Sequence, residues 1–285
     1  MASEKYVGLK KLVKAIAGPY LYEVIRHVIA HKRIPRLLNP VTFNDKTAHR
    51  KLYDHNPIYP IISDKALARD YVAERLGNDI LTQLYFCGDN VEDIDFDALP
   101  DSFVIKTTHG SGPDYIEFVH DKQQFGEDAL RKMAQELIHR DYGDTTNEWW
   151  YAQMIPQIII EEMLHDDEYG IPLDYKFFVF HDEVKFLQVD FSRYGSHART
   201  IYDREWIPQD FMLKRKKGPV TPKPQCFSEM IRIAECLGKG FDFIRIDLYC
   251  VNDKRVVFGE MTLSHGAGWE WFRPAKWDRI FGDLW

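Results

Sequence analysis

Two neighbouring segments decide the fold: Ile244-Arg245-Ile246-Asp247-Leu248-Tyr249-Cys250 and Val256-Val257-Phe258-Gly259-Glu260-Met261-Thr262. Both have the β-branched and aromatic composition of strands, and Asn252-Asp253-Lys254 between them is typical of a turn. We therefore predict an antiparallel hairpin. Side chains two residues apart share one face of a strand, so Arg245 and Asp247 project together and Glu260 can converge with them.

Two carboxylates with a neighbouring hydroxyl form a hard-oxygen site. Asp247, Glu260 and Thr262 would suit Mg²⁺ that is held partly by the phosphates of a substrate. Arg245 beside them would neutralise charge that builds up on a transferring phosphoryl group. Taken alone, the hairpin has a plainer explanation, which is an exposed turn with a surface salt bridge.

The glycine-rich turn Gly110-Ser111-Gly112 is a second candidate for phosphate binding. It follows Phe103-Val104-Ile105-Lys106, a predicted strand, and Tyr115 to Val119 is predicted to return as the other arm of a hairpin. Glycines let backbone amides approach an anion closely, Ser111 adds a donor, and Lys106 supplies positive charge. No Gly-Lys-Ser/Thr follows, so this is not a Walker P-loop. An ordinary hairpin turn is the alternative.

A buried strand predicted from Ile155 to Met163 ends in Glu161 and Glu162. Apolar walls with nearby carboxylates suit an adenine slot. Three more cations, Lys65, Lys176 and Arg193, would each be a solvated charge if taken alone. Together they are spaced along the chain as a split phosphate-binding cleft requires.

Lys65 begins a predicted helix over residues 63–77. Ser63 or Asp64 would cap its first turn and Gly77 would end it. Its buried stripe is predicted to consist of Leu67, Tyr71, Val72 and Leu76. Further strands are predicted at 176–181 and 184–190, and further helices at 127–139 and 227–237. Because the strands cluster in hairpins separated by helices, we expect an α+β fold, not a parallel doubly wound sheet.

Composition excludes several classes of protein. The chain has 285 residues, 45% of them hydrophobic, which excludes disorder, and its net charge of −7 argues against general nucleic-acid binding. No apolar run is long enough to cross a bilayer, and the start lacks a secretory pattern. The four scattered cysteines are expected to be reduced, packed thiols, and the protein is expected to be cytoplasmic, at or near the inner face of a membrane.

Residues 1–36 are strongly basic, with eight lysines and arginines against two glutamates, while the remaining chain is acidic. Leu9, Leu12, Val13 and Ile16 follow helical spacing, and Gly18-Pro19 should separate this helix from a second one. Two interpretations stay open: the pair contacts anionic lipid or a lipid-linked glycan, or it docks on the body with solvated lysines.

The order of these motifs resembles the ATP-grasp superfamily, and most closely its TupA-like branch, which is associated with bacterial capsule and surface-polysaccharide synthesis. The similarity runs from about Phe43 to Trp285. It rests on Asp64-Lys65, the strand with Lys106 and its glycine turn, Ile160-Glu161-Glu162-Met163-Leu164, the basic strand from Asp174 to Phe180, and the hairpin with Asp247 and Glu260.

The resemblance implies two α+β subdomains with antiparallel sheets that enclose ATP, after a helical N-terminal segment. The expected boundaries are 1–42, 43–100, 101–164 and 165–285. Its implied site residues are as follows: Lys65, Lys106, Gly110, Ser111 and Gly112 for the phosphates; Glu161, Glu162, Met163 and Leu164 for the nucleoside; Asp247, Glu260 and Thr262 for Mg²⁺; and Arg245, Lys176 and Arg193 for catalysis.

The implied activity is an ATP-dependent carboxylate–amine ligase that works through an acyl phosphate. The acceptor would be a uronic acid on an anionic glycan, and the donor an amino acid or another amine. A capsule glycosyltransferase is the first alternative, since Asp93-Ile94-Asp95 and Asp95-Phe96-Asp97 have the Asp-x-Asp form. A non-catalytic nucleotide-binding protein of capsule assembly is the second.

Two positions depart from the superfamily pattern. Thr262 stands where an asparagine usually supplies a metal ligand, which puts a second metal ion in doubt. Ser264-His265-Gly266-Ala267-Gly268 replaces a loop of small residues, so His265 and Gly266 are candidates for substrate contact. Trp149 is a further candidate, because aromatic side chains stack on sugar rings.

Overall fold

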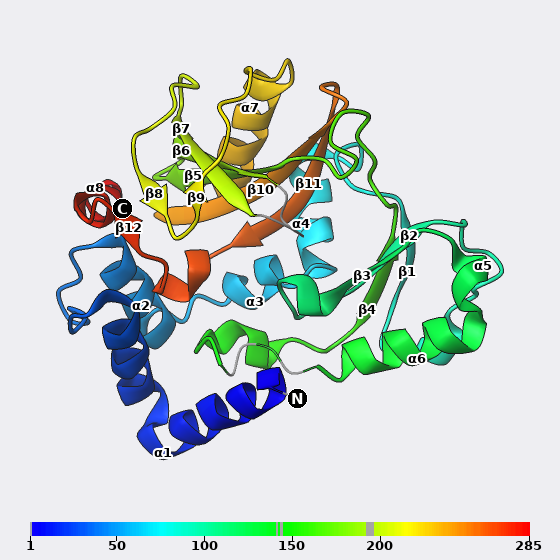
Figure 1. The fold of residues 1–285 in the computed structure, drawn as a ribbon, viewed down its shortest axis with the longest axis horizontal. Helices are drawn as coiled ribbons and strands as arrows, with labels where there is room; N and C mark the ends of the chain where they lie inside the picture. The colour runs from blue at the N-terminus through cyan, green and yellow to red at the C-terminus, as the bar shows by residue number, and fades with distance from the viewer. Residues whose placement is uncertain (1, 141, 143–144, 192–196) are drawn as a thin grey trace.

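The computed structural model describes residues 2–140, 142, 145–191 and 197–285. Two sheets dominate it (Figure 1). The smaller sheet has the order β1-β4-β2-β3, and the larger has the order β11-β10-β5-β6-β7-β9, antiparallel except for β9. The strands are β1 (Leu84–Gly88), β2 (Phe103–Thr107), β3 (Ile116–Val119), β4 (Ile158–Glu161), β5 (Asp174–Phe180), β6 (Glu183–Phe191), β7 (Ala198–Asp203), β9 (Lys216–Lys217), β10 (Phe243–Val251) and β11 (Arg255–Thr262), with a separate pair β8 (Met212–Leu213) and β12 (Phe272–Arg273).

Helices cover one face of each sheet and fill the space at their ends (Figure 1). They are α1 (Ala2–His31), α2 (Phe43–Tyr53), α3 (Ile58–Ser63), α4 (Leu67–Leu76), α5 (Lys122–Phe125), α6 (Glu127–Ile138), α7 (Phe227–Gly238) and α8 (Lys276–Leu284). Short 3₁₀ turns are η1 (Val91–Asp93), η2 (Pro113–Tyr115), η3 (Trp149–Gln153) and η4 (His265–Gly268).

The smaller sheet packs one face on α6. Alternation along β2 sends Phe103 and Ile105 into this core, where they meet Leu130 and Leu137 of the helix. The same alternation turns Val104 and Lys106 to the opposite face, which is the face that lines a cavity. The period of two in β2 therefore gives the sheet one face that packs on α6 and one face that lines the cavity.

The larger sheet is covered on one face by α7, whose apolar stripe meets Phe177 and Val179 of β5. On the other face, Phe178 joins an aromatic cluster around Phe43 of α2. The Phe43 ring centroid lies 4.9 Å from that of Phe243 and 5.8 Å from that of Phe281. This cluster fixes α2 and α8 at one end of the sheet and leaves the other end for polar side chains.

Several expectations are confirmed. The chain is α+β, β10 and β11 form the predicted hairpin with Asp247 opposite Glu260, and β2 pairs with β3. The helix predicted at 63–77 begins only at Leu67, although Asp64 Oδ1 accepts the N–H groups of Ala66 and Leu67. Leu67, predicted to be buried, is 47% exposed, because Ala68 takes the inward position beside Tyr71 and Val72.

The basic N-terminal segment breaks at Gly18, where φ is 71°, as its Gly-Pro pair predicts. Its first half leaves Leu9, Leu12 and Ile16 exposed by 56%, 57% and 79%. The helical spacing is therefore right, but these three side chains are not buried against the rest of the protein. No helix among the described residues has the length and apolar content needed to cross a bilayer.

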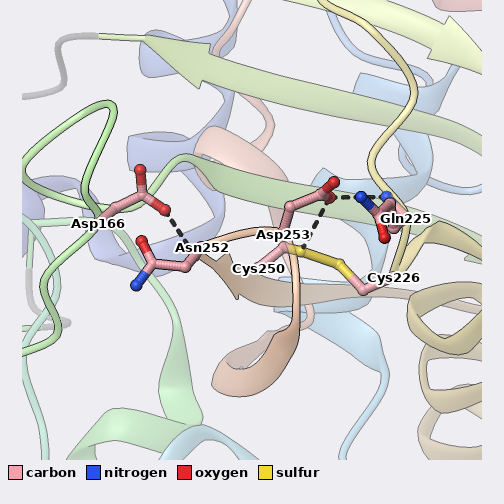
Figure 2. The surroundings of a disulfide bond; sticks show 6 residues. All are labelled: Asp166, Gln225, Cys226, Cys250, Asn252 and Asp253. Carbon is pink, nitrogen blue, oxygen red and sulfur yellow. Dashed lines mark hydrogen bonds between the residues drawn. A yellow bond between two sulfur atoms is a disulfide. The ribbon is translucent and has the colours of Figure 1, made fainter.

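The expectation of four free thiols is wrong. Cys226 and Cys250 form a disulfide that ties the start of α7 to the end of β10 (Figure 2). Asp253 beside it accepts the Gln225 backbone N–H at 2.6 Å, and Asn252 donates its own to Asp166 at 2.8 Å. The two cysteines lie 24 positions apart, and only the tertiary contact between α7 and β10 brings them together. Cys87 and Cys236 are free.

Replacing Phe43 should show how much the aromatic cluster contributes. Phe43→Ala removes a fully buried ring, so we expect the free energy of unfolding to fall by about 3–5 kcal/mol. Phe125→Ala, which truncates an exposed ring of α5, should change it by less than about 0.5 kcal/mol. Equilibrium urea unfolding measures both, and equal effects of the two substitutions would contradict this packing.

Candidate active site

A cavity of about 300 Å³ lies between the two sheets. The smaller sheet contributes Val104, Ile116 and Phe118, and Phe258 of β11 faces them from the larger one. Leu164, Ile171, Pro172 and Leu173, in the connection between the sheets, close the apolar part. An apolar cavity of this size with charged residues in its lining suits an aromatic base.

A smaller pocket of about 70 Å³ adjoins this cavity. The two spaces share four lining residues, Lys106, Ile116, Tyr249 and Gly259. Six more of the residues predicted for phosphate and metal line the smaller pocket, namely Lys65, Gly110, Ser111, Gly112, Asp247 and Glu260, whereas Thr262 is not among its lining residues. Residues far apart in the sequence thus surround one space, with two lysines facing two carboxylates.

Gly259 marks the point where the two spaces meet. It is the extra residue of a bulge, because Asp247 pairs with Glu260 and Leu248 with Phe258. A Cβ at Gly259 would lie 3.1 Å from both the Asp247 carbonyl oxygen and the Tyr249 ring. A larger residue here would have to displace the Tyr249 ring or the β10 backbone, so the bulge favours glycine.

Lys65 reaches the glycine turn from the segment before α4. Its backbone N–H donates to Thr108 O at 3.2 Å, and its Nζ donates to Gly110 O. Burial lowers the pKa of Lys65 to about 8, although Glu260 acts in the opposite direction. A side chain at Gly110 would collide with the Tyr115 ring, so the turn can pack this closely only as glycine.

Glu161, the last residue of β4, and Glu162, which follows it, both have cationic partners. Lys106 forms an ion pair with Glu161, which also accepts from Thr82 Oγ1 at 2.7 Å. Arg255 donates to both oxygens of Glu162, at 2.6 and 3.0 Å, and this contact lowers the pKa of that carboxyl. Both acids and Leu164 line the cavity, whereas Met163 is not among the lining residues.

Arg245 is the centre of a buried ionic cluster. Its Nε donates to Asp247 Oδ1 at 2.6 Å, and its Nη2 lies 2.7 Å from Asp247 Oδ2, 2.8 Å from Glu260 Oε1 and 2.9 Å from Thr262 Oγ1. Lys176 also contacts Asp247. Burial raises the pKa of Asp247 to about 6 despite its two cationic neighbours.

The oxygens of this cluster suit a magnesium ion. Three of them, from Asp247, Glu260 and Thr262, converge within 2.9 Å of one cationic nitrogen, Arg245 Nη2, so they already meet where positive charge is favoured. Carboxylate oxygens are the ligands that Mg²⁺ prefers. The Thr262 hydroxyl is engaged differently, since it donates to Glu260 at 3.2 Å while accepting from Arg245.

The remaining predicted residues lie elsewhere. His265 contacts Arg245 and Glu270 through its ring, and Gly266 provides the space that Glu270 occupies. Trp149 donates to Asp54 O at 3.0 Å and lines neither space. Arg193 lies outside the described residues.

Sequence reasoning gave no role to Asp174, Asp190 and Glu270. Asp174 Oδ2 lies 2.6 Å from Lys176 Nζ, and both Asp174 and Asp190 line the cavity. The available signal was the alternation of polar side chains along β5 and β6, which marks one face as polar. Glu270, between two tryptophans, follows no periodic pattern.

A family model described as TupA-like ATPgrasp matches residues 45–285. No curated protein matches the chain. Similar solved structures include D-alanine–D-alanine ligase from Bacillus anthracis, with 16% identity, a TM-score of 0.42, and coverage of 71% of this chain and 57% of that one. VanG D-Ala:D-Ser ligase from Enterococcus faecalis has 15% identity, a TM-score of 0.45, and coverage of 71% and 52%.

N5-carboxyaminoimidazole synthetase from Staphylococcus aureus, complexed with ADP, has 9% identity and a TM-score of 0.42. The match covers 71% of this chain and 44% of that one. This chain therefore spans about half the length of the solved structures it matches.

The pKa of Lys65 gives a test of its predicted contact with phosphate. At pH 8 about half of the Lys65 side chains are neutral, and a bound triphosphate would restore the proton. We expect calorimetric titration of a non-hydrolysable ATP analogue, in buffers of different ionisation enthalpy, to show proton uptake at pH 8 and much less at pH 6.5. Lys65→Arg should abolish the difference, because a guanidinium stays charged. Equal uptake in both proteins would exclude Lys65 as its source.

Proposed function

The chain belongs to the TupA-like ATP-grasp family, and from this premise we propose that it is an ATP-dependent ligase that joins a carboxylate to an amine. The observation that carries the proposal is the pair of adjoining spaces between the sheets. It combines an apolar slot, two lysines beside a glycine turn, and two carboxylates that share a buried arginine.

Each part of this space has a proposed role. Val104, Leu164 and Phe258 would hold the adenine, with Glu161 and Glu162 near its polar edge and the ribose. Lys65 and Lys106 would hold the phosphates beneath the glycine turn. Asp247 and Glu260 would hold Mg²⁺, which neutralises phosphate oxygens when it is bound.

The proposed reaction has two steps. A carboxylate oxygen of the acceptor attacks the γ-phosphorus of ATP, so that an acyl phosphate forms and ADP leaves. The amine nitrogen then attacks the acyl carbon, inorganic phosphate leaves with the bonding electrons, and the nitrogen loses a proton to give the amide. Arg245 and Lys176 would stabilise charge on the transferring group, so positioning and charge neutralisation carry the rate.

The proposed acceptor is a uronic-acid carboxylate of a bacterial capsular or surface polysaccharide or its precursor. The donor would be an amino acid or another amine, and the reaction would take place on the cytoplasmic side of the membrane. The character of the TupA-like branch supports this choice. Arg193, which lies outside the described residues, is the proposed contact for the acceptor.

The glycosyltransferase alternative rests on the acidic motifs at residues 93–97. Asp93, Asp95 and Asp97 are exposed, while Ile94 and Phe96 between them anchor the segment in the core of the smaller sheet. None of the three carboxylates lines the cavity. These contacts favour the ligase over a sugar-nucleotide transferase.

Assay of ADP release tests the proposal. Purified protein with ATP and Mg²⁺ should release ADP only when a uronic acid and an amine are both supplied from a panel of each. Arg245→Ala should lower kcat by about 10²–10³, as loss of a donor aimed at developing charge does. Arg279→Ala removes an exposed arginine of α8 and is the matched control. Consumption of a UDP-sugar without ATP would replace the ligase with the transferase.

We also propose that the first half of α1 rests on an anionic bilayer. Leu9, Leu12 and Ile16 are exposed, and residues 1–36 together carry a net charge of +6, the combination that favours an interfacial helix.

Leu12→Glu with Ile16→Glu should abolish co-sedimentation with vesicles that contain phosphatidylglycerol, because two carboxylates would enter the apolar layer. Val220→Glu, at an exposed apolar position on another surface, should leave it unchanged. Wild-type protein that remains in the supernatant, or equal sedimentation of the double variant, would contradict membrane contact.

A further inference from the structure

A chain of buried polar side chains starts at Arg245 and runs through His265, Glu270 and Arg199 to Asp190. Arg245 Nη1 lies 2.8 Å from His265 Nδ1, and His265 Nε2 lies 3.1 Å from Glu270 Oε2. Glu270 Oε2 in turn accepts from Arg199 Nη1 at 2.8 Å, and Arg199 Nε donates to Asp190 at 2.8 Å. All five side chains are buried.

The chemistry of the partners fixes the proton on the His265 ring. An arginine can only donate, so His265 Nδ1 is the acceptor and the ring proton is on Nε2, which donates to Glu270. Burial lowers the pKa of His265 to about 4, which agrees with a neutral ring at pH 7. Although burial acts to raise it, the contacts with His265, Arg199 and Lys214 hold the pKa of Glu270 well below its ordinary value. Glu270 therefore stays ionised, and its carboxylate accepts the hydrogen bond from His265 Nε2.

The loop that carries His265 is built to bring Glu270 back toward it. Gly266 and Ala267 both have positive φ, 54° and 55°, and a side chain at Gly266 would collide with Glu270. The loop is also anchored from outside, since Ala267 O accepts from Lys51 at 2.7 Å and Gly268 O accepts from His31 at 2.9 Å. The imidazole itself packs on Phe178, with 5.1 Å between ring centroids.

The contact with His265 differs from the other contacts of Arg245. Asp247, Glu260 and Thr262 supply the oxygens that Arg245 holds, and these are the same oxygens that would take a magnesium ion. Any cation bound there competes with the guanidinium for them. His265 Nδ1 lies outside that set of oxygens, so its hold on Arg245 does not depend on how the carboxylates are occupied.

We propose that His265, backed by Glu270, is a positioning residue that keeps Arg245 aimed at the γ-phosphate when Asp247 and Glu260 bind a cation. The proposal rests on the proposed function in one respect, that Arg245 faces the γ-phosphate. The sequence predicted that His265 contacts the substrate. In this proposal His265 acts by orienting Arg245 instead.

The test compares nucleotide affinities, not turnover alone. In wild type with Mg²⁺, calorimetry should show tighter binding of a non-hydrolysable ATP analogue than of ADP. His265→Leu cannot accept from Arg245, and this preference should fall about tenfold, the effect of one hydrogen bond to a charged group, while ADP affinity stays unchanged. His265→Asn supplies an acceptor oxygen and an N–H donor, and it should recover most of the preference.

Glu270→Gln and Glu270→Ala form a second pair that does not alter the ring. Glutamine can still accept from His265 Nε2, so it should resemble wild type, whereas alanine should reproduce His265→Leu without adding to it in the double variant. An unchanged ratio in His265→Leu, or equal losses in the leucine and asparagine variants together with a lower melting temperature, would overturn the proposal. Absence of any adenine-nucleotide binding by wild type would instead overturn the proposed function.

Discussion

One buried guanidinium holds the centre of this molecule together. Asp247 and Arg245 are almost inaccessible to water, and a carboxylate at that depth without a partner would destabilise the fold by several kcal/mol. The planar fork of Arg245 meets both oxygens of Asp247 and one of Glu260, which the single ammonium of a lysine does not match. The hairpin β10–β11 therefore closes with the carboxylates of Asp247 and Glu260 paired to Arg245.

The strand beside this hairpin shows how packing places the site. On one face of β5, Asp174 and Lys176 belong to the ionic cluster, while Phe178 and Phe180 further along belong to the aromatic cluster. The opposite face of β5 packs under α7. The aromatic cluster packs α2 and α8 against one end of the sheet. The polar side chains lie at the other end, where they face the smaller sheet across the cavity. The ionic cluster and the aromatic cluster are thus separated along a single strand.

Strong local patterns were enough to predict part of this arrangement. The hairpin β10–β11, the strand with Lys106 and the amphipathic helix α7 carry their periodicity in a few consecutive residues, and all three are present. The lysines, the glycine turn and the two carboxylates were identified by type and order, and they line one pocket. Their roles in binding and catalysis stay predictions.

Other features depend on contacts between distant segments and left no local signal. β1 is a strand because it pairs with the edge of β4, and Cys226 meets Cys250 because α7 packs on β10. Leu9 and Leu67 follow helical spacing but are exposed. Helical spacing predicts which side chains share one face of a helix, but it does not predict whether another segment packs on that face. Glu270 reaches His265 only through the conformation of the intervening glycine loop.

The bulge at Gly259 has a consequence for the walls of the two spaces. Gly259 and Tyr249 line both of them, and a Cβ at Gly259 would lie 3.1 Å from both the Asp247 carbonyl oxygen and the Tyr249 ring. A larger residue would have to push that ring or the β10 backbone aside. One substitution at this backbone position would therefore reshape the apolar cavity and the lysine-lined pocket at the same time.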